Sequence, residues 1–412
     1  MRKILALKVF RLTFIRLFLL FQVVLTFGYS QSTAPQRADS LFFSRWVAPH
    51  TLAGNPTGVW LSRLNMDFYS TPPQAIEITT HITTSNIWLP AANGYLPQDP
   101  EVIRSLRDVP FFTKGLRFDS RRSPALKKSL SADGVLRGFH TQVRLPVQKR
   151  SELKLGFNFY LLDGGRAPFS LWTNDGFIEW IHDNLTNIND PFGRREFAFN
   201  QAQIQFTDEE NRSLNLEKGS ITPANFTVNF KHYPAIAIPW LSAAAQMQLG
   251  INTASFNRSL DLGGGGSANI KLWHTERYRF TWSSGFTLLY QGVVENNKAV
   301  TLAKKDVLWD LKSQLLFQQK LRNGRGWGFS VIYTYSSAYY PKKELNDLVI
   351  TGNRFTSHWH HTITHLYRSQ RALYLAAHYK WKQFSLYGYL REDIPVNNAP
   401  DAQTGLGVQH HF

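Results

Sequence analysis

Residues 152–162 read ELKLGFNFYLL, and their apolar and polar side chains alternate. Leucine and phenylalanine occupy every second position up to Leu161, whereas mainly polar or small residues lie between them. Successive side chains of a β-strand point to opposite faces, so the alternation predicts a strand with one apolar face. A tilted strand crosses a bilayer with about 9–11 residues, which is close to the length of this stretch.

The same alternation recurs along the chain. It is found at residues 278–290, 326–336, 373–381, 384–390 and 405–412. Such strands predict an all-β protein, a transmembrane antiparallel up-and-down β-barrel with apolar side chains toward lipid and polar side chains toward a lumen. A soluble β-sandwich is the alternative, but its strands usually have about 5–6 residues, which is shorter than these stretches.

The terminal residue Phe412 follows an alternating strand, a pattern typical of bacterial outer-membrane barrels, in which the barrel-assembly machinery reads it. We therefore expect Phe412 on the periplasmic side, with short turns there and long loops outside. The expected periplasmic turns are 148–151, 233–239, 276–277, 322–325 and residue 382. The expected outer loops are 163–195, 255–266, 291–306, 341–370 and 394–402. This scheme gives 14 strands as the best even number, with 12 or 16 as alternatives.

The N-terminus has the layout of a secretory signal peptide. Basic residues precede an uncharged apolar stretch, and Gly28-Tyr29-Ser30, with small residues at 28 and 30, offers a cleavage site before Gln31. The apolar stretch is shorter than the about 20 residues of a spanning helix, so a retained anchor is the weaker alternative. We expect a cleaved signal peptide at 1–30, a periplasmic or lumenal segment at 31–56 and one outer-membrane barrel at 57–412.

The chain is basic, with 46 Lys and Arg against 29 Asp and Glu, and it has no cysteine. An exported membrane protein is a poor candidate for binding nucleic acid. Six basic residues fall on the polar parity of predicted strands: Lys154, Lys231, Lys271, Arg279, Lys312 and Arg391. If they line the lumen, a narrow cationic pore favours anions. The alternative is that basic residues at the rim and in the loops pair with lipopolysaccharide phosphates.

The longest expected loop contains GFIEWIH at 176–182, in which apolar residues recur at helical spacing. We expect a short amphipathic helix that folds into the mouth or plugs the lumen. Glu179 and His182 are three residues apart and are therefore neighbours on such a helix. An acid–base pair or two metal ligands is the alternative, but no third partner is visible.

A histidine cluster lies further along, at His358, His360, His361 and His365. On a strand His358 and His360 share a face, and on a helix His361 and His365 do, so either spacing can hold a divalent metal. The simpler interpretation is a wet outer loop near the rim, where imidazole is comfortable. We expect no bound metal and no cofactor.

Nucleophilic motifs are missing, because there is neither cysteine nor Gly-x-Ser-x-Gly. We therefore assign no catalytic residue, although a Ser–His pair formed by separate barrel strands has no sequence signature. Residues 263–266 are four glycines, and we expect a flexible loop tip there rather than a phosphate cradle, since no strand-to-helix context surrounds them.

Two segments resemble a known family. One comprises Asp163-Gly164-Gly165, then 176–182 and Phe192-Gly193; the other comprises 392–396, 399–401 and the strand that ends at Phe412. Both are similar to uncharacterised Gram-negative outer-membrane proteins grouped as a domain of unknown function. The resemblance implies a single outer-membrane barrel and no particular activity. The chain departs from the pattern at Arg194 and at His410-His411.

Together these features predict a channel or transport pore for small solutes, with anions favoured if the basic residues line it. An outer-leaflet enzyme that acts on lipid or lipopolysaccharide is one alternative, and a structural barrel with a plugged lumen is another. The expected partners are outer-membrane lipid, lipopolysaccharide and the barrel-assembly machinery.

Overall fold

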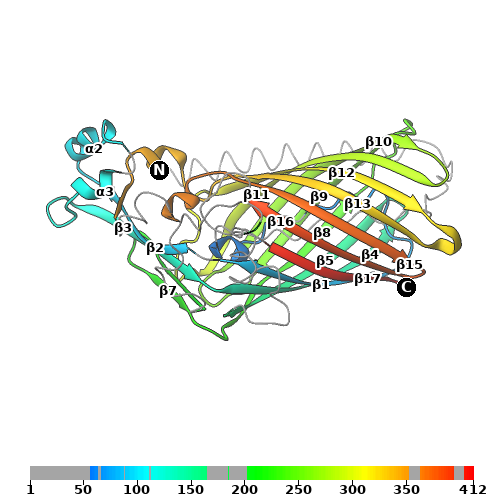
Figure 1. Ribbon diagram of the computed structural model, residues 1–412, viewed down its shortest axis with the longest axis horizontal. Coiled ribbons are helices and arrows are strands. Elements are labelled where there is room, and N and C mark those ends of the chain that lie inside the picture. The colour runs from blue at the N-terminus through cyan, green and yellow to red at the C-terminus, as the bar shows by residue number, and fades with distance from the viewer. Residues whose placement is uncertain are drawn as a thin grey trace.

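The computed structural model describes residues 56–63, 66–87, 89–110, 113–164, 184, 202–351, 362–393 and 403–412. Twelve antiparallel strands close a barrel in the order β1-β17-β16-β15-β13-β12-β11-β10-β9-β8-β5-β4, and β1 pairs with both β17 and β4 (Figure 1). The strands are β1 (Glu77–Asn86), β4 (Val135–Gln148), β5 (Ser151–Asp163), β8 (Ile221–His232), β9 (Leu241–Asn252), β10 (Arg258–His274), β11 (Tyr278–Asn297), β12 (Val307–Lys320), β13 (Gly326–Ser336), β15 (Gln370–Trp381), β16 (Phe384–Asp393) and β17 (Gln403–His411). The predicted antiparallel barrel is confirmed, but the preferred count of 14 strands is wrong.

Strands outside the barrel account for the miscount. A second sheet has the order β14-β2-β3-β6-β7. Its strands are β2 (Leu89–Pro97), β3 (Ala125–Asp133), β6 (Gln203–Thr207), β7 (Ser213–Leu216) and β14 (Val349–Thr351). Apolar and polar side chains alternate in these strands as they do in the barrel strands, because one face of this sheet is also buried. Alternation indicates that one face is covered, whether by lipid or by protein.

The barrel has two different ends. At one end lie Phe412 and five short hairpin connections, after β4, β8, β10, β12 and β15, and we call it the turn end. These five connections are the ones predicted as periplasmic turns. The second sheet lies at the opposite, loop end, together with the helices α2 (Pro100–Arg107) and α3 (Lys114–Arg117) (Figure 1).

One predicted loop is a strand. The glycines at 263–266 lie within β10, opposite residues 245–248 of β9 and 286–289 of β11, so the connection from β9 to β10 is much shorter than 255–266. A Cβ on Gly265 would lie 2.4 Å from the carbonyl oxygen of Phe286. Glycine within a strand often marks such a close approach of backbones, and here it does not mark a loop tip.

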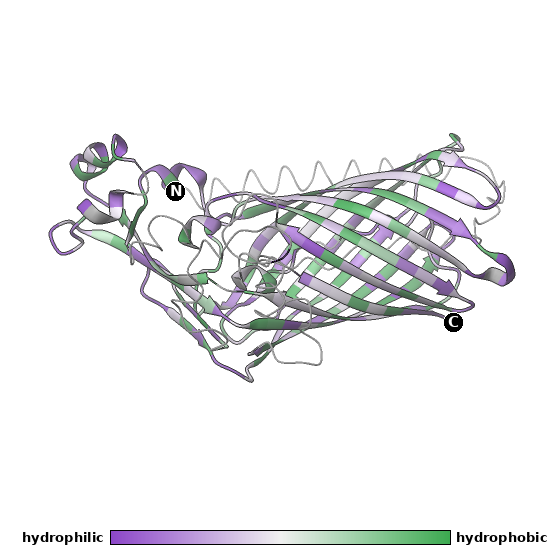
Figure 2. Ribbon diagram, in the orientation of Figure 1, coloured by the Kyte–Doolittle hydropathy of each residue, from purple (hydrophilic) through white to green (hydrophobic). Residues whose placement is uncertain are grey.

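Hydrophobic and hydrophilic residues alternate along the barrel strands (Figure 2). Outward side chains such as Phe329, Leu375, Leu386 and Leu406 are apolar and exposed, whereas the polar parity is buried inside the barrel. A closed sheet leaves no unpaired edge, which lipid requires. The architecture is therefore that of a membrane-spanning β-barrel of the outer-membrane type. Among the described residues, no helix is long and apolar enough to span a membrane.

An apolar core lies at the loop end. It brings together Trp60 and Leu61, which precede the barrel, with Leu130 and Phe206 of the second sheet. Tyr340 and other residues of the β13–β15 connection pack into the same cluster. The second sheet thus forms a cap that is continuous with the top of the barrel interior.

Candidate functional site in the barrel interior

The chain enters the barrel at the loop end before it forms β1. Residues 57–63 and 66–69, which we call the lumenal segment, are buried. Asn257, beside the start of β10, donates a hydrogen bond of 2.9 Å to the carbonyl oxygen of Trp60. Gln248 of β9 donates one of 3.0 Å to the carbonyl oxygen of Ser62, and the Ser62 hydroxyl donates to Asp261 of β10. Polar side chains of the wall therefore satisfy two backbone carbonyls of this segment.

Further along, Arg63 forms a buried ion pair with Asp310 of β12, with 2.7 Å between Nη1 and Oδ1. Its Nη2 also donates to the carbonyl oxygen of Ser337 at 3.0 Å. Met66 lies against β11 at Gly285, where a Cβ would come within 1.9 Å of its sulfur. The missing side chain at Gly285 gives the segment room to pass.

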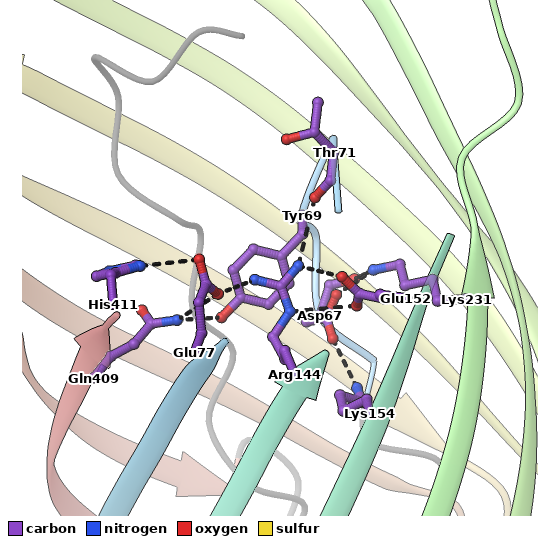
Figure 3. Close-up of polar contacts among 10 residues, drawn as sticks. All are labelled: Asp67, Tyr69, Thr71, Glu77, Arg144, Glu152, Lys154, Lys231, Gln409 and His411. Atoms are coloured by element: carbon purple, nitrogen blue, oxygen red, sulfur yellow. Dashed lines mark hydrogen bonds and ion pairs between the residues drawn. The ribbon is translucent and has the colours of Figure 1, made fainter. Parts of the chain in front are cut away.

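Asp67 is held by two lysines from neighbouring strands (Figure 3). Lys154 of β5 donates to Oδ2 at 2.7 Å, and Lys231 of β8 donates to Oδ1. Lys231 also reaches the Asp67 carbonyl oxygen at 3.3 Å. All three side chains are buried, so one carboxylate bridges two amines that point inward from the wall. We call this arrangement the Asp67 site.

A second ionic group lies beside it at the turn end. Arg144 of β4 contacts Glu152 of β5 at 2.5 Å and also pairs with Glu77 of β1 (Figure 3). Its guanidinium carbon lies 3.5 Å from the centre of the Tyr69 ring, a cation–π contact. Glu77 in turn contacts His411 of β17 at 2.9 Å. The pairing of β1 with β17, which closes the barrel, therefore shares charges with the group around the lumenal segment.

Six of the buried charges at the turn end are paired with one another. Asp67, Glu77 and Glu152 face Arg144, Lys154 and Lys231. A buried charge is costly unless it is paired, and here the lumenal segment brings one of the carboxylates. These six side chains therefore carry no net charge among themselves.

The structure separates the sequence-predicted site residues. Lys154, Lys231, Arg279, Lys312 and Arg391 are buried on the inner side of the wall, whereas Lys271 is half-buried near the β10–β11 turn. These six residues do not form one site, because only Lys154 and Lys231 share the Asp67 carboxylate among the contacts described above.

Other predicted residues fall elsewhere. Glu179, His182, His358, His360 and His361 lie outside the described residues. His365 is buried at the loop end, in the 3₁₀ turn Thr362–Leu366. The Phe412 side chain is 64% exposed, and its backbone N–H donates to the carbonyl oxygen of Ile76 at 3.1 Å.

Sequence reasoning missed Asp67, Glu77 and Arg144. Glu77 and Arg144 occupy inward positions of β1 and β4, and a search for alternation across residues 77–86 and 135–148 could have found them. Asp67 precedes the first barrel strand and has no periodic signal. The stacked pair His81 and His140, with ring centres 4.7 Å apart, was also missed.

The described residues offer little for enzymatic chemistry. Ser151 Oγ lies 3.0 Å from His232 Nδ1, but at the turn end and with no carboxylate bonded to the imidazole among the described contacts. A nucleophilic triad needs a third group to orient the base. Within the ranges that the structure covers, no group of three His, Asp or Glu residues is arranged to hold a metal.

No model of a known protein family matches the chain, and no curated protein matches it. Among solved structures, an outer membrane channel from Pseudomonas putida F1 is similar at a TM-score of 0.40 and 9% identity, covering 85% of this chain and 100% of that one. The transport unit of the autotransporter AIDA-I from Escherichia coli gives 0.38 and 8%, covering 88% and 100%. The KdgM porin gives 0.33 and 8%, covering 69% and 96%. At such low TM-scores these likenesses carry no argument about function.

Proposed function

We propose that the protein is an outer-membrane pore for small solutes and that the lumenal segment holds it closed. The observation that carries the proposal is the chemistry of the inner wall. Gln248, Asp261, Asp310, Lys154 and Lys231 meet the segment through hydrogen bonds and ion pairs. A barrel built only to be filled could use apolar side chains at these positions.

Polar contacts make the closed state reversible. A neutral hydrogen bond exchanged for water changes the free energy by only about 0.5–1.5 kcal/mol, because the polar groups are hydrogen-bonded in both states. If the segment leaves, water can hydrate the wall residues Gln248 and Asp261, whereas an apolar wall would lose its contacts without replacement. The inner wall therefore suits both a filled and a hydrated lumen.

A structural barrel with a permanent plug is the second candidate, and the loop end favours it. Trp60 is fully buried and packs edge-to-face against Phe256 at 5.2 Å. Val59 and Leu61 join the same apolar cluster. This apolar anchor fixes the start of the segment, so opening of the pore needs movement of the part from Arg63 to Tyr69.

Conductance distinguishes the two candidates. We propose comparing the wild type in planar bilayers with a variant that lacks residues 57–69. A gated pore predicts rare openings of the wild type and steady conductance of the variant. If the variant folds, as judged by its faster gel migration before heating, and does not conduct, the barrel is structural. Lys271→Gln, at the half-buried turn position, is the matched control and should behave as the wild type.

Export of the protein to the outer membrane is part of the same proposal. We propose that residues 1–30 are removed and that the barrel resides in the outer membrane, surrounded by phospholipid and lipopolysaccharide. The basic N-terminus before the apolar stretch supports this. Intact-mass measurement of protein from fractionated outer membrane should give a chain that begins at Gln31; an unprocessed chain in the inner membrane would contradict it.

A further inference from the structure

The Asp67 site has the geometry of a carboxylate-binding site. Each oxygen of the Asp67 side chain accepts a hydrogen bond from a different amine, Oδ2 from Lys154 and Oδ1 from Lys231. The amines come from β5 and β8, two neighbouring strands, whereas the carboxylate comes from a segment that belongs to no strand. The wall thus supplies the site, and the segment supplies the group that fills it.

We propose that the carboxylate of a small solute binds between Lys154 and Lys231 in place of Asp67 when the lumenal segment withdraws. Passage of that solute rests on the proposed pore, whereas its binding at the lysines does not. The lysines would be the contact that an anionic solute makes at the turn end of the lumen.

The barrel wall fixes the two amines without the help of the segment. Lys154 lies opposite Asn229 in the β5–β8 pairing, and Lys231 lies opposite Glu152. Both side chains are on inward positions of strands that are paired on both sides. Withdrawal of Asp67 therefore leaves the backbone positions of Lys154 and Lys231 unchanged.

The neighbouring charges explain why an anion would replace Asp67 at these lysines and not at Arg144. Arg144 has two carboxylate partners, Glu77 and Glu152, and both belong to wall strands. These pairs persist when the segment leaves. Glu152 remains opposite Lys231, but the carboxylate that bridges Lys154 and Lys231 leaves with the segment. The two ammonium groups that it neutralised then favour uptake of an anion in its place.

The bridging geometry favours a carboxylate over a halide. A carboxylate places two oxygens on two donors, as Asp67 does, whereas chloride has a single centre. Phosphate also has several oxygens, but the occupied state of this site holds a planar group with two. We therefore assign small carboxylates as the ligand class, with acetate as the probe.

Chemical rescue tests the site in the full chain. Asp67→Ala removes the carboxylate and leaves its space, so the variant purified in detergent should unfold at a lower temperature than the wild type. Acetate at tens of millimolar should raise that temperature by several degrees beyond sodium chloride of equal ionic strength, and it should have no such effect on the wild type. Asp67→Asn fills the space with a neutral group and should respond less.

Replacement of the two lysines is the decisive part of this experiment. In Asp67→Ala combined with Lys154→Gln and Lys231→Gln, the specific acetate effect should disappear. An acetate effect that persists without the lysines, or that equals the chloride effect in Asp67→Ala, would overturn the proposal. Rescue by phosphate without rescue by acetate would overturn the carboxylate assignment.

The acetate test of the Asp67 site and the conductance test of the pore can fail independently of each other. Rescue of Asp67→Ala together with no conductance of the variant lacking 57–69 keeps the site and rejects the pore. Steady conductance together with no rescue keeps the pore and rejects the carboxylate site.

Discussion

Arg63 Nη1 lies 2.7 Å from Asp310 Oδ1, and both side chains are almost completely buried inside the barrel. The pair joins the lumenal segment to β12, on the far side of the wall from the lysines that hold Asp67. The segment is therefore bound to well-separated strands of the wall, from β12 to β5 and β8.

Breaking this pair should be costly. Arg63→Gln removes the guanidinium from the buried ion pair with Asp310, and loss of one partner of a buried ion pair costs about 3–5 kcal/mol. Thermal unfolding of the detergent-solubilised barrel should show the loss, and conductance should rise as the segment loosens. The control is Arg104→Gln, whose pair with Glu101 is 74% exposed on both sides and should change stability by less than about 1 kcal/mol. Equal effects of the two variants would contradict a buried role for Arg63.

The contact of Gly285 with Met66 predicts a compensating pair. Gly285→Val places a side chain where the Met66 sulfur lies, and overpacking of this kind costs about 1–3 kcal/mol. Met66→Ala makes room, so the double variant should be more stable than the sum of the two single changes. A double-mutant cycle on unfolding midpoints measures this coupling. Additive changes would mean that the segment does not pass Gly285.

The cap has a pH-sensitive lysine. Burial lowers the pKa of Lys128 to about 8, although Glu209 at 2.8 Å favours its charged form. Between about pH 8 and the ordinary lysine pKa near 10.4, the unfolded chain binds a proton that the folded one has released. The free energy of unfolding should therefore rise with pH in this window. This gain is lost as the pH falls back through about 8.

Lys128→Met should flatten that rise, because the titrating group is removed. Unfolding midpoints between pH 7 and 10 measure it, and Lys127→Met, at the exposed neighbouring position of β3, is the matched control. Identical pH profiles for the wild type and Lys128→Met would refute the effect.

Phe412 should matter for assembly more than for stability. Its exposed ring makes an edge contact with His410 at 4.3 Å, so Phe412→Ala removes little packing from the folded barrel. We expect a lower yield of folded barrel in the outer membrane, with refolding into detergent micelles nearly unchanged. The outward-facing Phe157→Ala is the control. A normal yield in cells would contradict the assembly role.

The sequence predicted the barrel where alternation had a single cause. The strand at 326–336 coincides with β13, and 152–162 lies within β5, because lipid on one side and polar contacts on the other impose period two. Alternation in β2, β3 and β6 has another cause, burial against the cap core, and the two causes give the same pattern. Local composition also misled at 263–266, because glycine serves both loop tips and close strand contacts.

The site was harder to predict than the fold. Parity placed Lys154 and Lys231 on the inner wall, but their partner Asp67 is far away in sequence and lies on no strand. Nothing periodic marks a segment that is held by separate side chains of several strands. The pairing of charges across the lumen is a property of the closed barrel, and it appears only when the strands are in register.

Single-channel recording of the variant lacking residues 57–69 beside the wild type tests whether the lumenal segment closes a pore. We predict that the wild type is mostly closed and that the folded variant conducts steadily, with anion preference in asymmetric salt because Lys154 and Lys231 then face the lumen. A folded variant without conductance at any voltage would contradict the claim that the lumenal segment closes a pore.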